Sequence, residues 1–404
     1  MSKVKANLTH EIDEVALAQA QVYQIDFDSK GLPKNKFNLF EFAGSFGDLG
    51  VLIPFVVAYI TIVGLNPQGV LFGFGISLLF VGLYYRTPVP VQPMKAIGGA
   101  VIAQPSLGAG AVYGAGIFTG LFWLIASRFK AIQKIRNFVS KPVLRGIMFG
   151  LGFVFVSQGL GYMQDNLVLA AIGVVIILGF LASKKIPAML VLLLVGAIAA
   201  LILQPSLLGD LSAIRPHFEL PTIVLPQITP QDLLVGAIFL ALPQIPLTLG
   251  NAVIALVEEN NNLFPYRKIT ETQVAGTKGL MNIVSSVFGG VPLCHGAGGM
   301  AAHVRYGAHT GGATIFLGTI FLVLAFFFSD SILVLTELFP KAMLGVILMF
   351  AGIELAMSAK DVPREKSQFY LFLITAAFSM FNIALGFILG LVLQVLIDKN
   401  ILHI

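Results

Sequence analysis

The chain has 404 residues, of which 57% are hydrophobic and 11% charged, and its formal net charge is +5. A soluble core of this length does not need so much apolar surface, so the composition predicts a multi-pass membrane protein. In such a protein basic residues report orientation, and the positive charge therefore gives no argument for nucleic acid as a partner. The single cysteine, Cys294, excludes an internal disulfide and any metal site built on a cysteine pair.

Residues 1–40 are polar and of mixed charge, which predicts a loosely structured cytoplasmic tail and no secretory signal. Fourteen apolar segments follow, bounded by charged residues, prolines and glycines. In chain order they are 44–63, 68–85, 91–104, 111–127, 142–162, 166–183, 186–204, 231–257, 272–288, 293–304, 311–328, 340–358, 367–380 and 382–397. The third, the tenth and the last two fall short of the roughly 20 residues that a straight helix needs to cross a bilayer, which predicts half-helices or re-entrant pieces.

The basic residues test this count, because one span more or fewer would invert every later loop. With the N-terminus inside, all but four of the 25 lysines and arginines fall in the tails or in cytoplasmic loops. The loop residues are Arg86, Arg128, Lys130, Lys134, Arg136, Lys141, Arg145, Lys184, Lys185, Arg267, Lys268, Arg305, Lys360, Arg364 and Lys366. The exceptions are Lys95, Arg215, Lys278 and Lys341, and only Arg215 lies in a clear outside loop. This distribution predicts both termini in the cytoplasm, with a short C-terminal tail over residues 399–404.

The two halves of the chain resemble each other. The segment "FVSKPVLRGIMFGLGFVF" (138–155) is similar to "LFPKAMLGVILMFAGIEL" (338–355), and "RTPVPVQPMKAIGGA" (86–100) has a counterpart in "FGGVPLCHGAGGMAA" (288–302). Because seven spans per half is an odd number, the second half must be inserted upside down relative to the first. The predicted fold is therefore all-α, with about fourteen spans in two inverted repeats, 41–204 and 231–398, joined by an extracytoplasmic linker, 205–230.

The paired segments with prolines predict broken helices. X-Pro pairs force extended backbone over Pro88 to Val91, and Pro93 suits the first turn of the helix that follows. In the second half, glycines take the place of bulky residues, which lets the backbone come close to another group. Two helix N-termini would then face each other near the middle of the membrane, each with free N–H groups and about half a positive charge. Such a pair predicts an anion site.

Four segments together resemble a known family: "FAGSFGDLGVLIPF", "PVPVQPMKAI", "LTLGNAVIA" and "FGGVPLCHGAGGMAAHVRYGAHTG". They are similar to the signature segments of the molybdate transporter family, a branch of the sulfate permease superfamily that lacks a C-terminal regulatory domain. The resemblance covers about residues 37 to 397. It implies seven plus seven inverted spans, a core domain that moves against a gate domain, and a possible homodimer formed through gate domains.

The candidate residues lie around the two breaks and on the first and eighth spans. We expect the substrate to be bound by Gln92, Pro93, Met94, Lys95, Gln244, Cys294, His295, Gly296 and Ala297. Asp48 and His295 are the candidates for proton coupling, and Asn251 is expected to support the site. The alternatives are that Asp48 only braces the broken helices, that Lys95 snorkels to the surface, and that His295 is a structural hydrogen-bonding residue. Lys278 has no assigned partner.

The predicted function is proton-coupled import of a tetrahedral oxyanion, most specifically molybdate, across a cell membrane or bacterial inner membrane. Sulfate and tungstate remain alternative substrates, sodium an alternative coupling ion, and a nucleobase carrier or a channel-like anion conductor an alternative function. Motifs of hydrolases and ATP-driven pumps are absent, so we expect no enzyme activity, cofactor or metal. Nucleobase carriers of this fold would be expected to place carboxylates where Gln244 and His295 stand.

Overall fold

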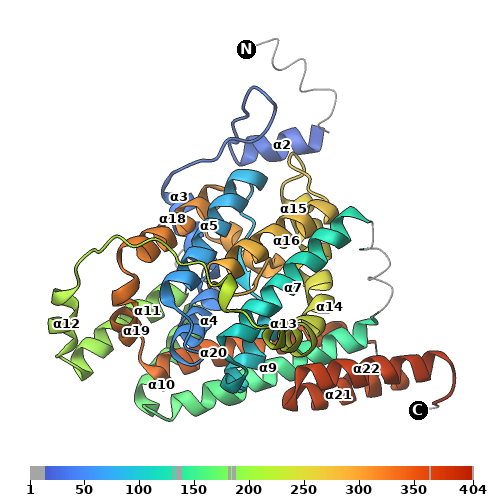
Figure 1. Ribbon diagram of the computed structural model, residues 1–404. Coiled ribbons are helices and arrows are strands. Elements are labelled where there is room, and N and C mark those ends of the chain that lie inside the picture. Colours follow the sequence, from blue (N-terminus) through green and yellow to red (C-terminus); the bar gives the residue numbers. More distant parts are fainter. Residues whose placement is uncertain are drawn as a thin grey trace.

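The computed structural model describes residues 14–129, 139–180, 188–363 and 365–402, together with residues 132 and 183. The described chain is mainly helical, with one two-stranded sheet (Figure 1). Some of the sequence predictions fall outside the described residues: the tail residues 1–13 and 403–404, and the loop residues Lys130, Lys134, Arg136, Lys184, Lys185 and Arg364.

Each of the fourteen predicted segments coincides with helical structure. In the first half the elements are α2 (Glu14–Val22), α3 (Leu39–Ser45), η1 (Phe46–Asp48), α4 (Leu49–Thr61), α5 (Pro67–Tyr85), β1 (Gln92–Pro93), α6 (Lys95–Ala103), η2 (Pro105–Leu107), α7 (Gly108–Arg128), α9 (Lys141–Met163), α10 (Leu167–Phe180), α11 (Ala188–Leu203) and α12 (Leu207–Ala213). The short helices α2 and α12 lie in the regions predicted as tail and linker.

The second half contains a long helix that winds locally as a π-helix. The elements of this half are η3 (Leu225–Gln227), α13 (Pro230–Val235), η4 (Gly236–Ala241), α14 (Leu242–Leu247), η5 (Thr248–Ile254), α15 (Ala255–Leu263), α16 (Glu271–Val287), β2 (Leu293–Cys294), α17 (Ala297–Arg305), α18 (Gly312–Phe327), η6 (Ser329–Ser331), α19 (Ile332–Glu337), α20 (Lys341–Ala356), η7 (Met357–Asp361), α21 (Lys366–Phe381) and α22 (Ile383–Asp398).

Helix ends follow local capping chemistry. Thr270 and Gln273 form a reciprocal capping box at the start of α16. Asn66 caps α5 ahead of Pro67. Asn382, in extended backbone, ends α21 and caps α22, so that these two helices form a hairpin.

Five helices of the described chain are long and apolar enough to cross a membrane, and two bent helix pairs would raise the number to seven. The five are Leu39–Thr61, Pro67–Tyr85, Pro105–Arg128, Lys141–Met163 and Pro230–Leu263. The bent pairs are Leu190–Leu203 with Leu207–Ala213 and Gly312–Phe327 with Ser329–Glu337. Length and composition thus support a multi-pass membrane protein.

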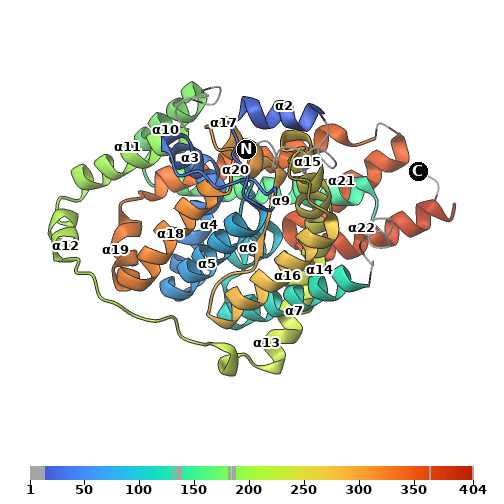
Figure 2. The ribbon, with the colours of Figure 1, turned by 90° about the horizontal axis from the view of Figure 1, so that it is seen from above.

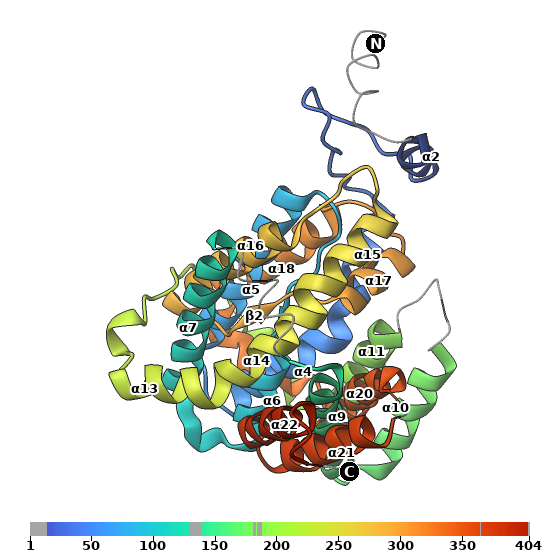
Figure 3. The same cartoon turned by 90° about the vertical axis from the view of Figure 1, so that its right-hand side faces the viewer.

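The helices form two groups that meet along one interface (Figures 1 and 3). The upper bundle contains α3 to α7 and α13 to α18. The lower bundle contains α9, α10, α11 and α20 to α22. Seen from above, the linker with α12 and η3 runs around the outside from one end of the molecule to α13 (Figure 2). The pocket described below lies where the two bundles meet.

Helices α9 and α20, which contain the two similar segments found in the sequence, pack closely against each other. A Cβ atom added at Gly152 would lie 2.6 Å from the carbonyl oxygen of Gly352, and one added at Gly159 would lie 2.6 Å from the carbonyl oxygen of Gly345. Since the residue numbers rise in α9 as they fall in α20, the helices are antiparallel. Glycine is therefore required here for backbone contact rather than for unusual dihedral angles.

Residues 14–37 are structured, contrary to the expected loose tail. After α2, the chain crosses the ends of α5 and α18: Asp28 accepts a 2.6 Å hydrogen bond from the Arg86 guanidinium, and the Tyr23 ring stacks on His309 at 3.9 Å. Asn35 donates to the carbonyl of Gly82. We call residues 14–37 the N-terminal strap. The prediction from composition missed the strap because the residues that hold it lie far away in the sequence.

The Arg86 hydrogen bond, with help from the Leu32 and Lys30 backbone N–H groups, lowers the pKa of Asp28 from 3.8 to about 2. Because the folded pKa lies below the unfolded one, the stabilisation is full above about pH 4 and is lost as the pH falls through about 2. We expect Asp28→Asn to increase deuterium uptake of the strap at pH 7, as measured by hydrogen exchange. The exposed Asp26→Asn is the control. Equal protection in both variants would contradict a docking role for Asp28.

Candidate functional site

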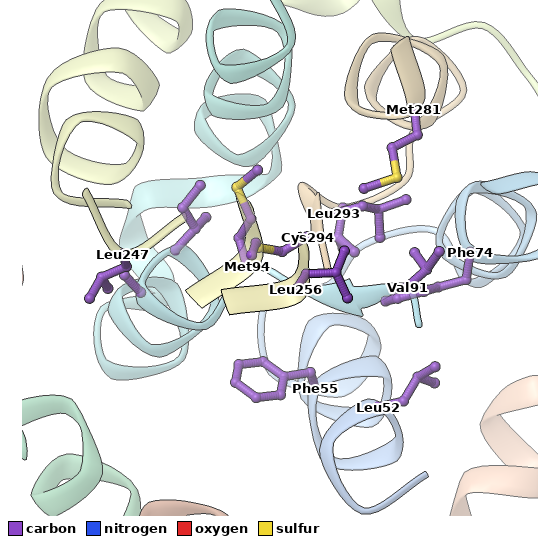
Figure 4. Packing of buried hydrophobic residues seen from close by; sticks show 14 of the residues in the cluster. Leu52, Phe55, Phe74, Val91, Met94, Leu247, Leu256, Met281, Leu293 and Cys294 are labelled. Carbon is purple, nitrogen blue, oxygen red and sulfur yellow. The ribbon is translucent and has the colours of Figure 1, made fainter. Parts of the chain in front are cut away.

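The two broken segments meet as a pair of short antiparallel strands in the upper bundle. Gln92 pairs with Cys294 and Pro93 with Leu293, and the Met94 N–H donates to the Pro292 carbonyl. Figure 4 shows the strands side by side among buried side chains, with Leu52 and Phe55 of α4 on one side and Met281 of α16 on the other. Residues 88–91 precede β1 and have no helical structure.

The helix after β1 begins later than predicted. Pro93 belongs to the strand, Met94 is the N-cap, and α6 starts at Lys95, so the expectation that Pro93 occupies the first helical turn was wrong. The physical reason is the pairing itself, because Pro93 can lie in a strand where its missing N–H is not needed. On the other side Gly296 is the N-cap and Ala297 the first residue of α17. Both half-helices have nine residues.

Asn282 of α16 holds β2 in place. Its amide nitrogen donates to the Leu293 carbonyl at 2.7 Å, and its amide oxygen accepts from the Leu293 N–H at 2.8 Å. The side chain is fully buried. This residue was missed in the sequence, although an asparagine inside an apolar helix is a signal for a buried backbone partner.

A pocket lies between the strands and the lower bundle, with about 390 Å³ of space that includes the solvent at its opening. It is lined by Gln92, Pro93, Lys95, Gln244, Leu247, Asn251, Cys294 and His295 from the upper bundle and by Met148, Leu151 and Leu355 from the lower bundle. Seven of the residues predicted from the sequence therefore come together here. Met94, Gly296, Ala297 and Asp48 do not line the pocket, and the side chain of Met94 is buried in the core.

Asp48 and Gln92 form a buried pair. The Gln92 amide donates to Asp48 Oδ1 at 2.6 Å, while Asp48 Oδ2 has no hydrogen-bond partner among the described residues. A Cβ atom at Gly299 of α17 would lie 2.8 Å from Asp48 Oδ2, so α17 packs directly on this pair. One of the two amide N–H bonds of Gln92 is thus used by Asp48, and the other remains for the pocket.

Gln244 is also already engaged. Its amide oxygen accepts from the backbone N–H of Ala96 at 2.8 Å, and its nitrogen donates to Thr248 Oγ1 at 3.1 Å. The carbonyl end of Gln244 therefore occupies the N-terminus of α6. Sequence reasoning expected Gln244 as a donor to an oxyanion; in this structure one N–H bond is left for that role.

His295 is fully buried and its Nδ1 lies 2.8 Å from the Pro90 carbonyl. A carbonyl oxygen only accepts, so this contact assigns the proton to Nδ1 and makes Nε2 an acceptor in the neutral ring. Nε2 has no partner within the described ranges. A lone pair at this position can take up a proton but cannot donate to an anion unless the ring is protonated.

Lys278 of α16 lies behind the pocket wall. It is fully buried, and its ammonium donates to Thr248 Oγ1 at 3.1 Å and to Cys294 Sγ at 2.9 Å. Thr248 thereby links Lys278 to Gln244. The sequence placed Lys278 in a span but gave no indication of these partners.

A larger cavity adjoins the pocket, with about 1170 Å³ of space that includes the solvent at its opening. Met148, Leu247 and Asn251 line both, so the two spaces are neighbours. The cavity also contains the basic residues Lys141 and Arg145 and the acidic residue Glu258. We call it the vestibule.

The sequence matches the model of a protein family described as "Molybdate transporter of MFS superfamily" over residues 40–155 and 236–355. The chain belongs to this molybdate transporter family. Molybdate transporter 2 of Arabidopsis thaliana is 31% identical over 414 residues, which cover 90% of this chain and 88% of the relative. The matched segments contain the strands, both half-helices and every residue that lines the pocket.

The fold of this family member resembles two solved anion transporters. The transmembrane domain of the cyanobacterial bicarbonate transporter BicA matches with a TM-score of 0.58 at 20% identity, covering 89% of this chain and 99% of that one. Murine Slc26a9 in its inward-facing state matches with a TM-score of 0.66 at 15% identity, covering 93% and 70%. The family description and the Arabidopsis relative are those of transporters rather than enzymes, and the fold resembles that of these two anion transporters.

We expect Gln92→Ala to weaken molybdate binding at least tenfold, because loss of a donor to a charged ligand costs about 1.5–3 kcal/mol. The backbone N–H groups of α6 remain, so the variant should still fold, with a lower melting temperature because Asp48 Oδ1 loses its described partner. Affinity and melting temperature are measured on the same purified sample. Gln104→Ala, at the other end of α6, is the control. Native affinity in Gln92→Ala would remove Gln92 from the site.

Proposed function

We propose that this chain is a secondary active transporter that imports a tetrahedral oxyanion, molybdate above all, by alternating access. The observation that carries the proposal is the pocket beside Lys95, the first residue of α6, and beside Cys294 and His295, which lead into α17. The partial positive charge of a helix N-terminus is a favourable environment for an anion. The resemblance to plant molybdate transporters supports molybdate as the substrate.

Other substrates of the same fold are less consistent with the pocket. A nucleobase needs acceptors for its ring N–H groups, and a carboxylate would be the strongest, but Gln244 and His295 stand at those positions. Sulfate and tungstate share the shape and charge of molybdate. A channel-like conductor remains an alternative that the transport assay tests.

The architecture that we propose has fourteen spans in two inverted repeats, 41–204 and 231–398, with both termini in the cytoplasm. The upper bundle corresponds to the core domain and the lower bundle to the gate domain. In this proposal the vestibule with Lys141 and Arg145 opens to the cytoplasm, because these residues belong to a basic loop. Exposed apolar side chains of α10 and α22, such as Val175 and Ile388, would face lipid or a second copy of the chain.

Purified protein in liposomes tests the substrate. We expect saturable uptake of labelled molybdate that tungstate and sulfate reduce by competition and that uracil leaves unchanged, because only the first two are tetrahedral dianions. An inward proton gradient should stimulate this uptake. Empty liposomes are the control. Competition by uracil, or no uptake of molybdate under any gradient, would contradict the proposed function.

Import needs coupling to an ion. Moving a dianion into a negative-inside cell costs about 2.3 kcal/mol per charge at 100 mV. We propose protons as the coupling ions, with Asp48 and His295 as acceptors, because each has a buried atom without a partner in the described chain: Oδ2 of Asp48 and Nε2 of His295. Sodium is the alternative coupling ion, and the liposome assay with an inward proton gradient distinguishes it from protons.

We expect Asp48→Asn to retain molybdate binding within about tenfold, since asparagine can still accept from the Gln92 amide. The variant cannot take up a proton, so stimulation of uptake by an inward pH gradient should be lost. Glu258→Gln, which alters a carboxylate in the vestibule, is the control. Unchanged stimulation in Asp48→Asn would reassign Asp48 to bracing the broken helices.

A further inference from the structure

Lys278 is a fully buried lysine without an ion-pair partner. No carboxylate of the described residues lies within 4.0 Å of its ammonium, and its two hydrogen bonds go to a hydroxyl and a sulfur atom. The Trp123 ring lies 5.7 Å from the nitrogen. Buried charges in proteins are normally paired, because an isolated charge away from water is costly.

The titratable groups around Lys278 do not supply the missing negative charge. Cys294 contacts it from β2, and His295 follows Cys294 along the chain. Tyr85 of α5 is hydrogen-bonded to Thr277, the residue next to Lys278. Neither Thr248 of η5 nor Trp123 of α7 is acidic. The described surroundings thus contain a thiol, an imidazole and a phenol, but no carboxylate.

Lys278 nevertheless lies directly behind the pocket. Cys294, which receives one of its hydrogen bonds, lines the pocket. Thr248 receives the other and is bonded to Gln244, which also lines it. The ammonium is therefore one side chain away from the space where an anion would bind, and its full burial leaves its charge little screened by water.

Lys95, the other lysine at the site, differs in its surroundings. It lies at the first position of α6, is half-buried and lines the pocket itself. Lys278, in contrast, is fully buried behind the pocket wall with no carboxylate partner in the described chain. The anion in the pocket is the remaining candidate for its counter-charge.

We propose that Lys278 is the cation that balances the bound anion and sets the preference of the pocket for divalent over monovalent oxyanions. The proposal rests on the proposed function, that is, on anion binding in this pocket. Lys278 does not touch the anion in this proposal. Its hydrogen bonds to Cys294 and Thr248 hold its positive charge directly behind the pocket wall. Its removal costs a divalent anion more than a monovalent anion of the same shape, because the Coulomb attraction scales with the charge of the ligand.

Molybdate and perrhenate provide the test, since both are tetrahedral oxyanions of similar size but carry two charges and one. Their affinities are measured by competition on purified wild-type protein and on Lys278→Met. We expect the ratio of molybdate to perrhenate affinity to fall at least tenfold in Lys278→Met, the lower end of what loss of a charged partner causes. A ratio measured within one sample is independent of the folded fraction.

Lys278→Arg keeps the charge and should restore a ratio within about threefold of the wild type; Lys278→Gln, which is neutral, should resemble Lys278→Met and replaces it if that variant does not fold. Lys141→Met, which removes a vestibule charge, is the matched control and should leave the ratio unchanged. An unchanged ratio in Lys278→Met, or an equal loss of both affinities, would overturn the proposal. If the wild type bound neither anion, the proposed function itself would fail instead.

Discussion

The structure depends on how two interrupted helices satisfy their backbone away from water. Away from water an unpaired N–H or C=O group costs several kcal/mol, so irregular backbone is tolerated only where protein supplies partners. Here the two strands β1 and β2 supply hydrogen-bond partners to each other. Asn282 binds the N–H and the carbonyl oxygen of Leu293. With that cost removed, the chain can stop and restart a helix in the middle of a bundle, and each restart exposes a positive helix end.

The pairing of β1 with β2 also arranges the polar side chains of the pocket. Gln92 pairs with Cys294 across the strands, and its side chain reaches Asp48, while Lys278 and Gln244 meet at Thr248. Most donors and acceptors therefore hold one another in place before any ligand arrives. Such mutual bonding keeps the rotamers fixed, which reduces the entropy lost when an anion binds.

Much of this arrangement could be predicted from the sequence because its signals are local. Apolar runs predicted the helices, and the spacing of prolines predicted extended backbone before α6. The partners of Thr248 and Asn282 could not be predicted, since Lys278 and Leu293 lie 30 and 11 residues away in the sequence. The start of α6 was placed too early because strand pairing with the other half decided it. The strap was missed because its stability comes from Arg86 and His309 rather than from its own composition.

The hydrogen bond from the Ala96 N–H to the Gln244 carbonyl bears on which ions can enter. It places a neutral amide oxygen at the helix end where one oxygen of a bound anion would accept. An incoming ion must displace this internal competitor or use the donors beside it. A halide, a weak acceptor with a single atom, gains little from that exchange, whereas an oxyanion engages several donors at once. If the pocket binds an anion as proposed, the glutamine would impose a threshold of hydrogen-bonding strength on the ion, and without an ion it keeps the Ala96 N–H satisfied.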